Sequence, residues 1–419
     1  MRIALMNDSF PPQIDGVSNV VVNYAQVLTL KGDESMVAVP DYPGAEDRYP
    51  FPVLRYTSLN TTKMVGYRAG YPFSASAVGK LKDFGPQIIH SHCPIASNLL
   101  ARTLREQTGA PIIFTYHTKF DIDIRTAVKG HLLQNELIAA LVRNVSASDE
   151  VWTVSRGAGE NLRSIGYEGD YIVMENGVDM PRGRADEKQV EKVNSLCALT
   201  PGVPVFLFAG RLRWYKGIRH IIEGLALAQR AGADFRMVFV GDGSDRHAIE
   251  TLCSQAGLDS RCTFTGAIQD RDLLRGFYSR ADLFLFPSTF DTNGIVVREA
   301  AACGLGALLI RGSCAAEGVT DGRNGLLMEE DPEHLCRQVL WACKHPDEVR
   351  SIGDKAQQEL YISWETAVDR ARERYETVLE NWHSRGEKHR GDLIPFVSDW
   401  IGTVNRVREI GQQVFDLLR

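Results

Sequence analysis

The chain has 419 residues, of which 44% are hydrophobic and 24% charged, a composition typical of soluble globular proteins. This length predicts about two domains, each with a sizeable core. The formal net charge of -6 does not indicate bulk electrostatic attraction to nucleic acid or to an anionic membrane, although it allows a local basic patch. No nucleic-acid partner is expected.

The first half of the chain alternates between short apolar runs and helical patterns. The runs cover residues 2–8, 35–41, 87–92, 111–117, 149–155 and 171–177. Helical patterns such as Val17–Leu30 and Ile95–Thr108 lie between them. Apolar runs without polar alternation indicate strands buried on both faces. Strand–helix alternation predicts a parallel, doubly wound α/β sheet.

The second half repeats this scheme. Its predicted strands cover residues 204–211, 235–243, 261–266, 281–288 and 306–312. The charged stretch 181–202 breaks at a Pro-Gly pair, and we interpret it as the connection between two Rossmann-like domains, at 1–180 and 181–362. Because ligands of such sheets bind beyond the carboxyl ends of the strands, we expect one cleft between the domains.

Residues 363–419 are expected to form C-terminal helices, the first of which crosses back to the N-terminal domain. A helical pattern follows Trp364, and a polar break at 383–392 precedes a last amphipathic segment. The charges of that segment are mixed, whereas a membrane-binding helix carries an excess of Lys and Arg. We therefore expect it to pack against the protein or against a second subunit, as in a homo-oligomer.

Cysteine usage and the N-terminus favour a cytoplasmic protein. The eight cysteines form no Cys-x-x-Cys pair, which favours reduced thiols over disulfides or zinc ligation. The stretch MRIALMNDSF lacks the long apolar region and cleavage site of a signal peptide. No run reaches the roughly 18 apolar residues of a membrane span, so any membrane contact is expected to be peripheral.

The stretch FPSTFDTNGIVVREAAACG, residues 286–304, places two acids around a predicted helix start. Thr292 or Asn293 is expected to cap the helix, and Gly294 permits close backbone approach. Free N–H groups at residues 293–295 attract a phosphate or a sugar hydroxyl. Asp291 and Glu299 would accept hydrogen bonds from a polyol; the alternative is a helix cap with a solvated glutamate.

This stretch resembles the signature of the retaining glycosyltransferases of family 4. Four further regions match the family in order: DGVSNVV (15–21), FTYHT (114–118), ENGVD (175–179), and a region in two parts, GRLRWYKG (210–217) and GDGSDR (241–246). The resemblance extends to about residue 382 and implies the GT-B architecture of two Rossmann-like domains. Asp291 departs from the usual Glu of the motif, and Glu175 from a usual Pro.

The resemblance implies a nucleotide-sugar donor and a role for each matching residue. Arg211 and Lys216 would neutralise the diphosphate leaving group, whose charge grows as the glycosidic bond breaks. Without the motif, both cations would be read as solvated surface residues. The backbone of Gly16 would cradle the same diphosphate, and Gly241 lies in the nucleotide loop.

The donor's sugars would meet the acids and a histidine. The resemblance implies that Glu299 binds the ribose hydroxyls. Asp291 and the backbone of Asn293, Gly294 and Ile295 would hold the hydroxyls of the donor sugar. His117 would bond that sugar near its anomeric centre; the alternative is a structural histidine.

No covalent nucleophile is expected, because the family resemblance implies front-face attack by the acceptor hydroxyl. Two patterns, Asp121-Ile122-Asp123 and His90-Ser91-His92, contain metal-ligating residue types. Three residues alone are a weak signal, and we expect no metal and no cofactor.

Residues 55–82 indicate the acceptor side. They contain five cations and no acid, interleaved with Tyr56, Tyr67, Tyr71 and Phe73. The cations are Arg55, Lys63, Arg68, Lys80 and Lys82. This combination fits anionic lipid headgroups, and the alternative is a solvated loop. The region and FTYHT most resemble bacterial enzymes that glycosylate diacylglycerol or related lipids.

The predicted activity is therefore transfer of a hexose, with UDP-glucose favoured and GDP-mannose open, to a membrane glycerolipid. We place the protein in the cytoplasm, peripherally at the inner face of the cell membrane. The alternatives are a soluble sugar or small-molecule acceptor, a sugar-nucleotide isomerase and a non-enzymatic scaffold of the same fold. A dinucleotide oxidoreductase is disfavoured because GDGSDR lacks the G-x-G-x-x-G spacing.

Overall fold

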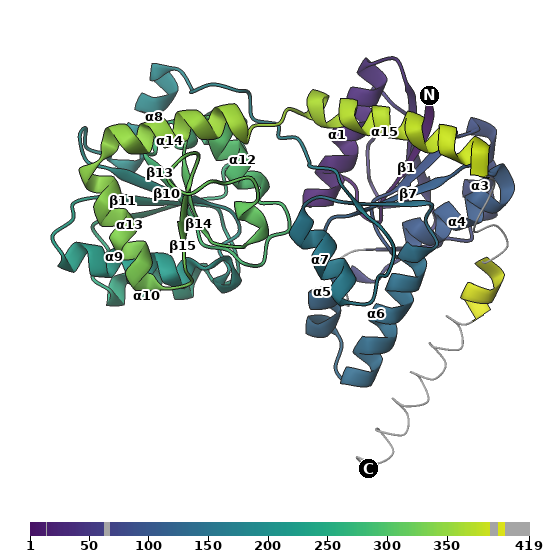
Figure 1. The fold of residues 1–419 in the computed structure, drawn as a ribbon, viewed down its shortest axis with the longest axis horizontal. Coiled ribbons are helices and arrows are strands. Elements are labelled where there is room, and N and C mark those ends of the chain that lie inside the picture. Colours follow the sequence, from purple (N-terminus) through teal and green to yellow (C-terminus); the bar gives the residue numbers. More distant parts are fainter. Residues whose placement is uncertain (14, 63–67, 386–392, 399–419) are drawn as a thin grey trace, which may run out of the picture. The chain divides into compact units, whose positions relative to one another are not determined.

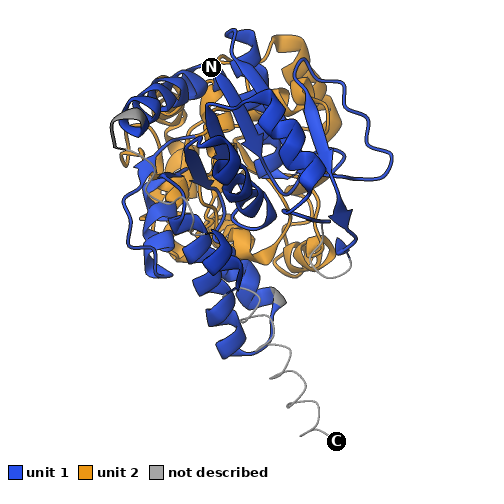
Figure 2. Cartoon of the chain, turned by 90° about the vertical axis from the view of Figure 1, so that its right-hand side faces the viewer, with its two compact units in different colours: residues 1–175, 364–419 blue, residues 176–363 orange. Residues whose placement is uncertain are grey.

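The computed structural model describes residues 1–13, 15–62, 68–385 and 393–398. The chain divides into two compact units (Figures 1 and 2). Unit 1 comprises Met1–Glu175 and Trp364–Arg419, and unit 2 comprises Asn176–Ser363. The sequence placed the two boundaries after residues 180 and 362, so the observed first boundary lies earlier in the chain. Unit 2 is an insertion within unit 1.

Unit 1 is built on a seven-stranded sheet in the order β3-β2-β1-β6-β7-β8-β9, and every neighbouring pair is parallel. The strands are β1 (Arg2–Met6), β2 (Glu34–Pro40), β3 (Val53–Tyr56), β6 (Ile88–Ser91), β7 (Ile112–Tyr116), β8 (Glu150–Thr153) and β9 (Ile172–Val173). The order reverses between β1 and β6, which is where ligands of such sheets bind. The six predicted strands are confirmed, whereas β3 and the antiparallel pair β4 (Ser58–Leu59) and β5 (Ala69–Gly70) were missed.

Helices cover the sheet of unit 1 (Figure 1). They are α1 (Gly16–Leu30), α3 (Ala75–Phe84), α4 (Ala96–Thr108), α5 (Phe120–Ala127), α6 (His131–Ser146), α7 (Arg156–Ser164) and α15 (Trp364–Arg385). α1 begins where predicted because Asp15 and Ser18 form a reciprocal capping box.

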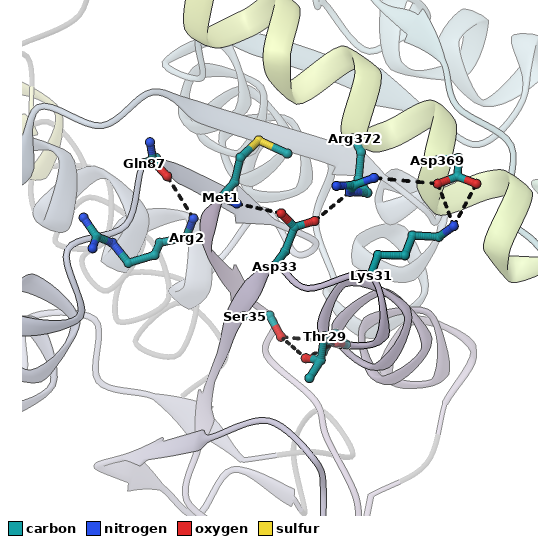
Figure 3. A network of polar contacts seen from close by, with 10 residues as sticks. Met1, Arg2, Thr29, Lys31, Asp33, Ser35, Gln87, Asp369 and Arg372 are labelled. Atoms are coloured by element: carbon teal, nitrogen blue, oxygen red, sulfur yellow. Dashed lines mark hydrogen bonds and ion pairs between the residues drawn. The ribbon is translucent and has the colours of Figure 1, made fainter.

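The last of these helices, α15, packs against α1, although more than 300 residues separate them in the sequence. Figure 3 shows the ion pairs at this contact. The carboxylate of Asp33 accepts hydrogen bonds of 2.6 Å from Arg372 Nε and from the amine of Met1, and Lys31 pairs with Asp369 at 2.8 Å. Asp33 is buried, so its partners compensate the cost of desolvating its charge.

Unit 2 is built on a six-stranded parallel sheet in the order β12-β11-β10-β13-β14-β15. The strands are β10 (Val205–Ala209), β11 (Arg236–Val240), β12 (Cys262–Gly266), β13 (Leu283–Phe286), β14 (Ala307–Ile310) and β15 (Leu326–Met328). β10 and β13 are buried along their whole length, as the unalternating runs predicted, and Phe208 stacks on Phe286 between them. Here too the strand order reverses, between β10 and β13.

The helical elements of unit 2 are α8 (Glu187–Cys197), η1 (Trp214–Lys216), α9 (Ile218–Arg230), α10 (Arg246–Gln255), α11 (Arg271–Arg280), α12 (Ile295–Ala302), η2 (Cys314–Ala316), α13 (Pro332–Lys344) and α14 (Pro346–Glu359). α8 corrects the sequence interpretation, because it occupies the stretch that we read as a connection. Asp186 caps it by accepting a hydrogen bond of 2.8 Å from the Gln189 N–H. α8 packs against α11 and buries Val193 and Cys197.

The two segments that join the units lie side by side. Val178 bridges to Ser363 and donates a 3.0 Å backbone hydrogen bond to Ile362. Within the part of the chain that the structure describes, no helix is long and apolar enough to cross a bilayer. Most of the predicted last amphipathic segment, and with it the predicted subunit contact, lies outside the described residues.

Candidate functional site

Three loops of unit 2 meet at the carboxyl edge of its sheet: residues 210–217 after β10, 241–245 after β11, and 287–294 after β13. β10 lies between the other two strands, so its loop contacts both neighbours. Gly210 and Leu212 donate backbone hydrogen bonds of 2.9 and 3.0 Å to Val240 and Asp242. The loop that resembles a phosphate-binding loop is thereby fixed in place.

Two glycines make the close contact of these loops possible. A Cβ atom on Gly241 would lie 1.9 Å from the carbonyl oxygen of Gly210, and one on Gly217 would lie 2.0 Å from that of Pro287. Both residues have positive φ, at 135° and 75°, where other residues are strained. Gly241 therefore has a structural role, and its predicted contact with the nucleotide stays a prediction.

Lys216 and Asp291, both predicted site residues, form an ion pair between the loops after β10 and β13. Lys216 is 8% exposed, and the Asp291 carboxylate also accepts a 2.5 Å hydrogen bond from Ser288 Oγ. The rings of Tyr215 and Phe290 pack 4.5 Å apart beside this pair and join the same two loops. A buried ammonium group needs such a partner, because desolvation of an unpaired charge is costly.

Arg211 differs from Lys216 in being solvent-exposed. Its neighbours Gly210 and Leu212 are fixed by backbone hydrogen bonds, so its Cα position is defined. Among the described residues, none forms an ion pair or a hydrogen bond with the Arg211 guanidinium. This group is therefore available for an anion, to which it offers a planar set of donors.

The start of α12 differs from the sequence prediction. Gly294 occupies the N-cap position at φ 60°, without a side-chain capping hydrogen bond, so Thr292 and Asn293 do not cap the helix. Asn293 instead is 7% exposed, and neither its Oδ1 nor its Nδ2 has a hydrogen-bond partner within the described ranges. Burying an amide group without hydrogen-bond partners lowers the stability of the folded protein. Asn293 lies next to the first N–H groups of α12, which have no intrahelical acceptor.

Glu299 lies in the second turn of α12 and is 7% exposed, which excludes the alternative of a solvated glutamate. Its Oε1 accepts a 2.8 Å hydrogen bond from Arg271, and its Oε2 accepts one of 3.0 Å from Tyr278 Oη. Burial and the neighbouring Glu299 carboxylate raise the pKa of Tyr278 well above its usual value, so the phenol remains a donor. The two hydrogen bonds therefore fix the orientation of the Glu299 carboxyl group.

Arg271 and Tyr278 are site residues that the sequence analysis missed. They lie seven positions apart on α11, which places both side chains on one face of the helix. That spacing was visible in RDLLRGFYSR, but nothing in it identified Glu299 as the partner.

In unit 1, Gly16 is the first residue of α1, directly after the N-cap Asp15. Ser9 Oγ donates a 2.6 Å hydrogen bond to Asp15, which fixes the loop after β1. A Cβ atom on Gly16 would have no described atom within 4 Å. The backbone of Gly16 is therefore open to close approach, as a cradle for a diphosphate requires.

His117 follows β7 and is 6% exposed. Its Nε2 lies 2.9 Å from Nδ1 of His92, which follows the neighbouring strand β6. Burial lowers the pKa of His117 to about 3, so its imidazole is neutral at physiological pH. The sequence analysis had considered His92 only as part of a weak metal pattern.

The other residues of the two metal patterns have protein partners. Asp121 accepts a 3.2 Å hydrogen bond from Asn161, and His90 contacts Tyr375 and Thr115. Across the described residues, no group of three or more His, Cys, Asp or Glu side chains is arranged to hold a metal ion. Whether the protein works without a metal stays a prediction.

The basic and aromatic segment 55–82 divides into two parts. Arg55 pairs with Asp47 at 2.7 Å, Arg68 donates to the Asp41 carbonyl at 2.9 Å, and Tyr56 is buried. These three side chains are structural, which corrects their assignment to a lipid-facing surface. Lys63 and Tyr67 lie outside the described residues.

The remaining part is exposed. Tyr71 and Phe73 are 47% and 38% exposed, and their rings pack edge to face at 6.0 Å. Lys80 and Lys82 on α3 are exposed as well. We call these four residues the aromatic–lysine surface.

Two family models match the chain, one for each half. The model "Glycosyltransferase Family 4" matches residues 14–182, and the model "Glycosyl transferases group 1" matches residues 198–359. The chain belongs to the GT-B glycosyltransferases. Its two parallel-sheet units are the two Rossmann-like domains of that fold.

Curated relatives of this glycosyltransferase act on several substrates. It is 25% identical over 403 residues to the sulfoquinovosyl transferase SQD2 of Arabidopsis thaliana (92% of this chain, 75% of the relative). It is 20% identical over 375 residues to the alpha-monoglucosyldiacylglycerol synthase of Acholeplasma laidlawii (85% and 92%). It is 26% identical over 385 residues to a GDP-mannose-dependent alpha-mannosyltransferase of Mycobacterium tuberculosis (90% and 97%).

Solved structures confirm the fold. The glycosyltransferase superposes on Anabaena HepE, crystallised in complex with UDP-glucose, with a TM-score of 0.70. The superposition covers 90% of this chain and 100% of HepE at 17% sequence identity. At this identity the likeness establishes the fold alone.

Proposed function

We propose that this glycosyltransferase transfers a hexose from a nucleotide-activated donor, with UDP-glucose favoured, to a hydroxyl group of a membrane glycerolipid, with retention of the anomeric configuration. The observation that carries the proposal is the arrangement at the carboxyl edge of unit 2. There an exposed Arg211, a buried Lys216, a half-buried Asp291 and a buried Glu299 are held on three adjoining loops and the first turns of α12.

The two cations suit a diphosphate leaving group. Negative charge develops on the phosphate oxygens as the glycosidic bond breaks, and fixed positive charge stabilises it. The Arg211 guanidinium supplies paired N–H donors, and the Lys216 ammonium supplies a charge whose position Asp291 fixes. Open backbone at Gly16 in unit 1 is proposed to contact the same diphosphate.

The acids and Asn293 suit the hydroxyl groups of the donor. The oxygens of Glu299 keep lone pairs beyond those that Arg271 and Tyr278 use, so they can accept hydrogen bonds from ribose hydroxyls. Asp291 and the start of α12 are proposed to hold the sugar. The unpartnered amide of Asn293 supplies one acceptor and two donors there, which a polyol can satisfy.

The proposed reaction is front-face displacement. The acceptor oxygen attacks the anomeric carbon on the side of the leaving group, and the bond from that carbon to the phosphate oxygen breaks. The electron pair of that bond stays with the phosphate oxygen, which takes the proton of the acceptor hydroxyl. His117, neutral because of its burial, is proposed to hydrogen-bond the sugar beside the anomeric carbon without exchanging a proton. We propose that no metal or cofactor takes part.

The lipid acceptor is supported by two observations. Two of the relatives named above are a sulfoquinovosyl transferase and a diacylglycerol-modifying synthase. The aromatic–lysine surface combines amphipathic rings with exposed cations, which suits the boundary of an anionic membrane. We propose a cytoplasmic enzyme that binds peripherally to the inner face of the cell membrane.

A donor and acceptor panel tests the proposal. UDP- and GDP-sugars are incubated with the enzyme, with and without diacylglycerol vesicles, and nucleotide release and the anomeric configuration of the product are measured. We expect release to depend on a UDP-hexose and on the lipid, with an α-linked product from an α-linked donor. Turnover of the donor without acceptor would favour an isomerase, and turnover only with soluble sugars would overturn the lipid acceptor.

Vesicle co-sedimentation tests the membrane surface separately. We expect binding to vesicles that contain anionic lipid, and at least a several-fold weaker binding after replacement of Lys80 and Lys82 by alanine. If neither the wild-type protein nor the variant bound to neutral or to anionic vesicles, this part of the proposal would be overturned.

A further inference from the structure

Three buried histidines of unit 1 form what we call the histidine stack: His90, His92 and His117. All three are at most 6% exposed. The rings of His90 and His92 lie 4.0 Å apart, and those of His92 and His117 stack at 5.2 Å. The proposed mechanism uses only His117, so the stack contains two histidines without an assigned role.

His90 anchors one end of the stack. Its Nδ1 lies 2.6 Å from Tyr375 Oη on α15, and its Nε2 lies 2.7 Å from Thr115 Oγ1 on β7. Both ring nitrogens therefore have partners, and the ring cannot turn without losing them. The role of His90 is to give His92 a fixed surface to pack on.

His92 is held equally firmly but is bonded on one side only. Its backbone N–H donates a 2.8 Å hydrogen bond to Met6, and the Tyr24 ring packs against it edge to face at 5.6 Å. Its Nδ1 lies 2.9 Å from Nε2 of His117. Its Nε2 is buried and has no hydrogen-bond partner in the described part of the chain.

The protonation state of this pair follows from burial. Desolvation lowers the pKa values of His90, His92 and His117, so all three rings are neutral. Tyr24 on α1 and Tyr375 on α15, two titratable groups that pack on the stack, keep their protons because burial raises their pKa values. One hydrogen atom therefore lies between His92 Nδ1 and His117 Nε2, and it belongs to one of the two rings.

The unpartnered nitrogen of His92 decides which ring carries that hydrogen. If His117 were the donor, the single proton of His92 would lie on Nε2 as a buried N–H without an acceptor, which proteins rarely tolerate. If His92 is the donor, its Nε2 is a bare lone pair, and His117 carries its own proton on Nδ1. The second arrangement leaves no orphaned N–H on His92.

We propose that His92 is a positioning residue that donates to His117 Nε2 and thereby fixes His117 as the tautomer protonated at Nδ1. Given the proposed role of His117, that ring then offers the donor sugar an N–H rather than a lone pair. The sugar oxygen beside the anomeric carbon is accordingly a hydrogen-bond acceptor. His92 thus determines whether His117 donates or accepts the hydrogen bond to the sugar, although His92 itself does not contact the sugar.

The test compares two substitutions of nearly equal size, His92→Asn and His92→Asp. The Asn amide can place an N–H close to the position of Nδ1 and donate to His117, whereas the Asp carboxylate can only accept. The measurement is the ¹⁵N chemical shifts of His117 in full-length protein labelled at histidine, with the signals assigned by their loss in a His117→Gln spectrum. Thermal unfolding of each variant reports whether it folds.

We expect the Nδ1-protonated tautomer in the wild-type protein and in His92→Asn, and a proton on Nε2 in His92→Asp. We also expect His92→Asn to keep kcat within about threefold, while His92→Asp loses at least tenfold. If His92→Asp does not fold, His92→Leu replaces it and should show a mixture of tautomers. A wild-type His117 protonated at Nε2, or one tautomer in all variants, would overturn the proposal. The shifts are read without substrate, so a protein with the expected tautomer but no glycosyl transfer would refute the proposed function alone.

Discussion

In both sheets the strand order reverses near the centre, but the side chains at the two carboxyl edges differ in charge. At the edge of unit 1, His92 and His117 are buried and neutral because desolvation has removed their charge. At the edge of unit 2, Lys216 and Glu299 are buried and each forms an ion pair with an oppositely charged side chain. One arrangement suits hydrogen bonds to an uncharged group, and the other suits the neutralisation of a growing charge.

In the proposed function, this difference gives the two units separate tasks. Paired charges are already ordered before a ligand arrives, so they need no reorganisation when charge develops. Neutral rings orient a substrate without competing for its phosphate groups. The following predictions, from the largest expected effect to the smallest, test whether the division holds.

The first prediction removes charge from the edge of unit 2. Lys216→Ala and Glu299→Ala should each lower turnover at least ~10²-fold, the loss expected when one charge-stabilising contact is removed. Nucleotide release at saturating donor is the measurement. Lys188→Ala, which changes an exposed lysine on α8, is the matched control and should keep the wild-type rate. Near-normal rates in both site variants would show that the chemistry lies elsewhere.

The second prediction disturbs the loop contact that supports those charges. Gly241→Ala should cost roughly 2 kcal/mol more free energy of unfolding than Gly232→Ala, as measured by urea denaturation. Both glycines have positive φ, but only at Gly241 would the new Cβ meet a backbone oxygen, at 1.9 Å. Gly232→Ala serves as the control for strain alone, about 1 kcal/mol. If both variants lost the same free energy of unfolding, the close contact of the loops at Gly241 would not contribute to stability.

The third prediction concerns the shortened acid of the motif. Asp291→Glu adds one methylene group to a side chain that Lys216 and Ser288 both hold, so the carboxylate must shift relative to the sugar. We expect kcat/KM for the preferred donor to fall about tenfold, the usual effect of one methylene group in a fitted site. Asp259→Glu, at an exposed position, should have no effect. An unchanged ranking of donor sugars would separate Asp291 from sugar selection.

The fourth prediction tests the neutral edge of unit 1 through pH. The native histidine stack binds fewer protons than the unfolded chain below the usual histidine pKa of 6.5, so the free energy of unfolding should fall as the pH falls below that value. His92→Asn removes one such group and should reduce the slope by up to about 1.4 kcal/mol per pH unit. Urea unfolding at pH 7, 6 and 5 measures it. His247→Asn, at an exposed site on α10, should retain the wild-type slope; an equal change in both variants would contradict the prediction.

Much of the fold could be predicted because the central strands are buried on both faces and read as uninterrupted apolar runs. Short edge strands are harder to recognise: β3 is only partly buried, and β15, although buried along its length, has just 3 residues. α8 was missed because its charged exposed face dominates the composition, although Val193 and Cys197 follow helical spacing.

The site was predicted only as far as local motifs reach. Lys216, Asp291 and Glu299 lie in recognisable stretches, but the partners Arg271 and Tyr278 reach Glu299 from another helix. The contact of His92 with His117 joins residues that directly follow two neighbouring strands, and no local pattern encodes it. Such contacts depend on tertiary packing, which a single sequence does not display.

The return of the chain to unit 1 at Trp364 also fixes an order of events on the ribosome. α15 supplies Tyr375 to His90 and Arg372 to Asp33, yet it is synthesised after all of unit 2. A nascent chain that ends before this helix already contains every strand of the second sheet, while the first sheet still lacks part of its cover. The inserted unit can therefore fold during translation, and the N-terminal unit is completed last, which reverses the usual order for multidomain chains.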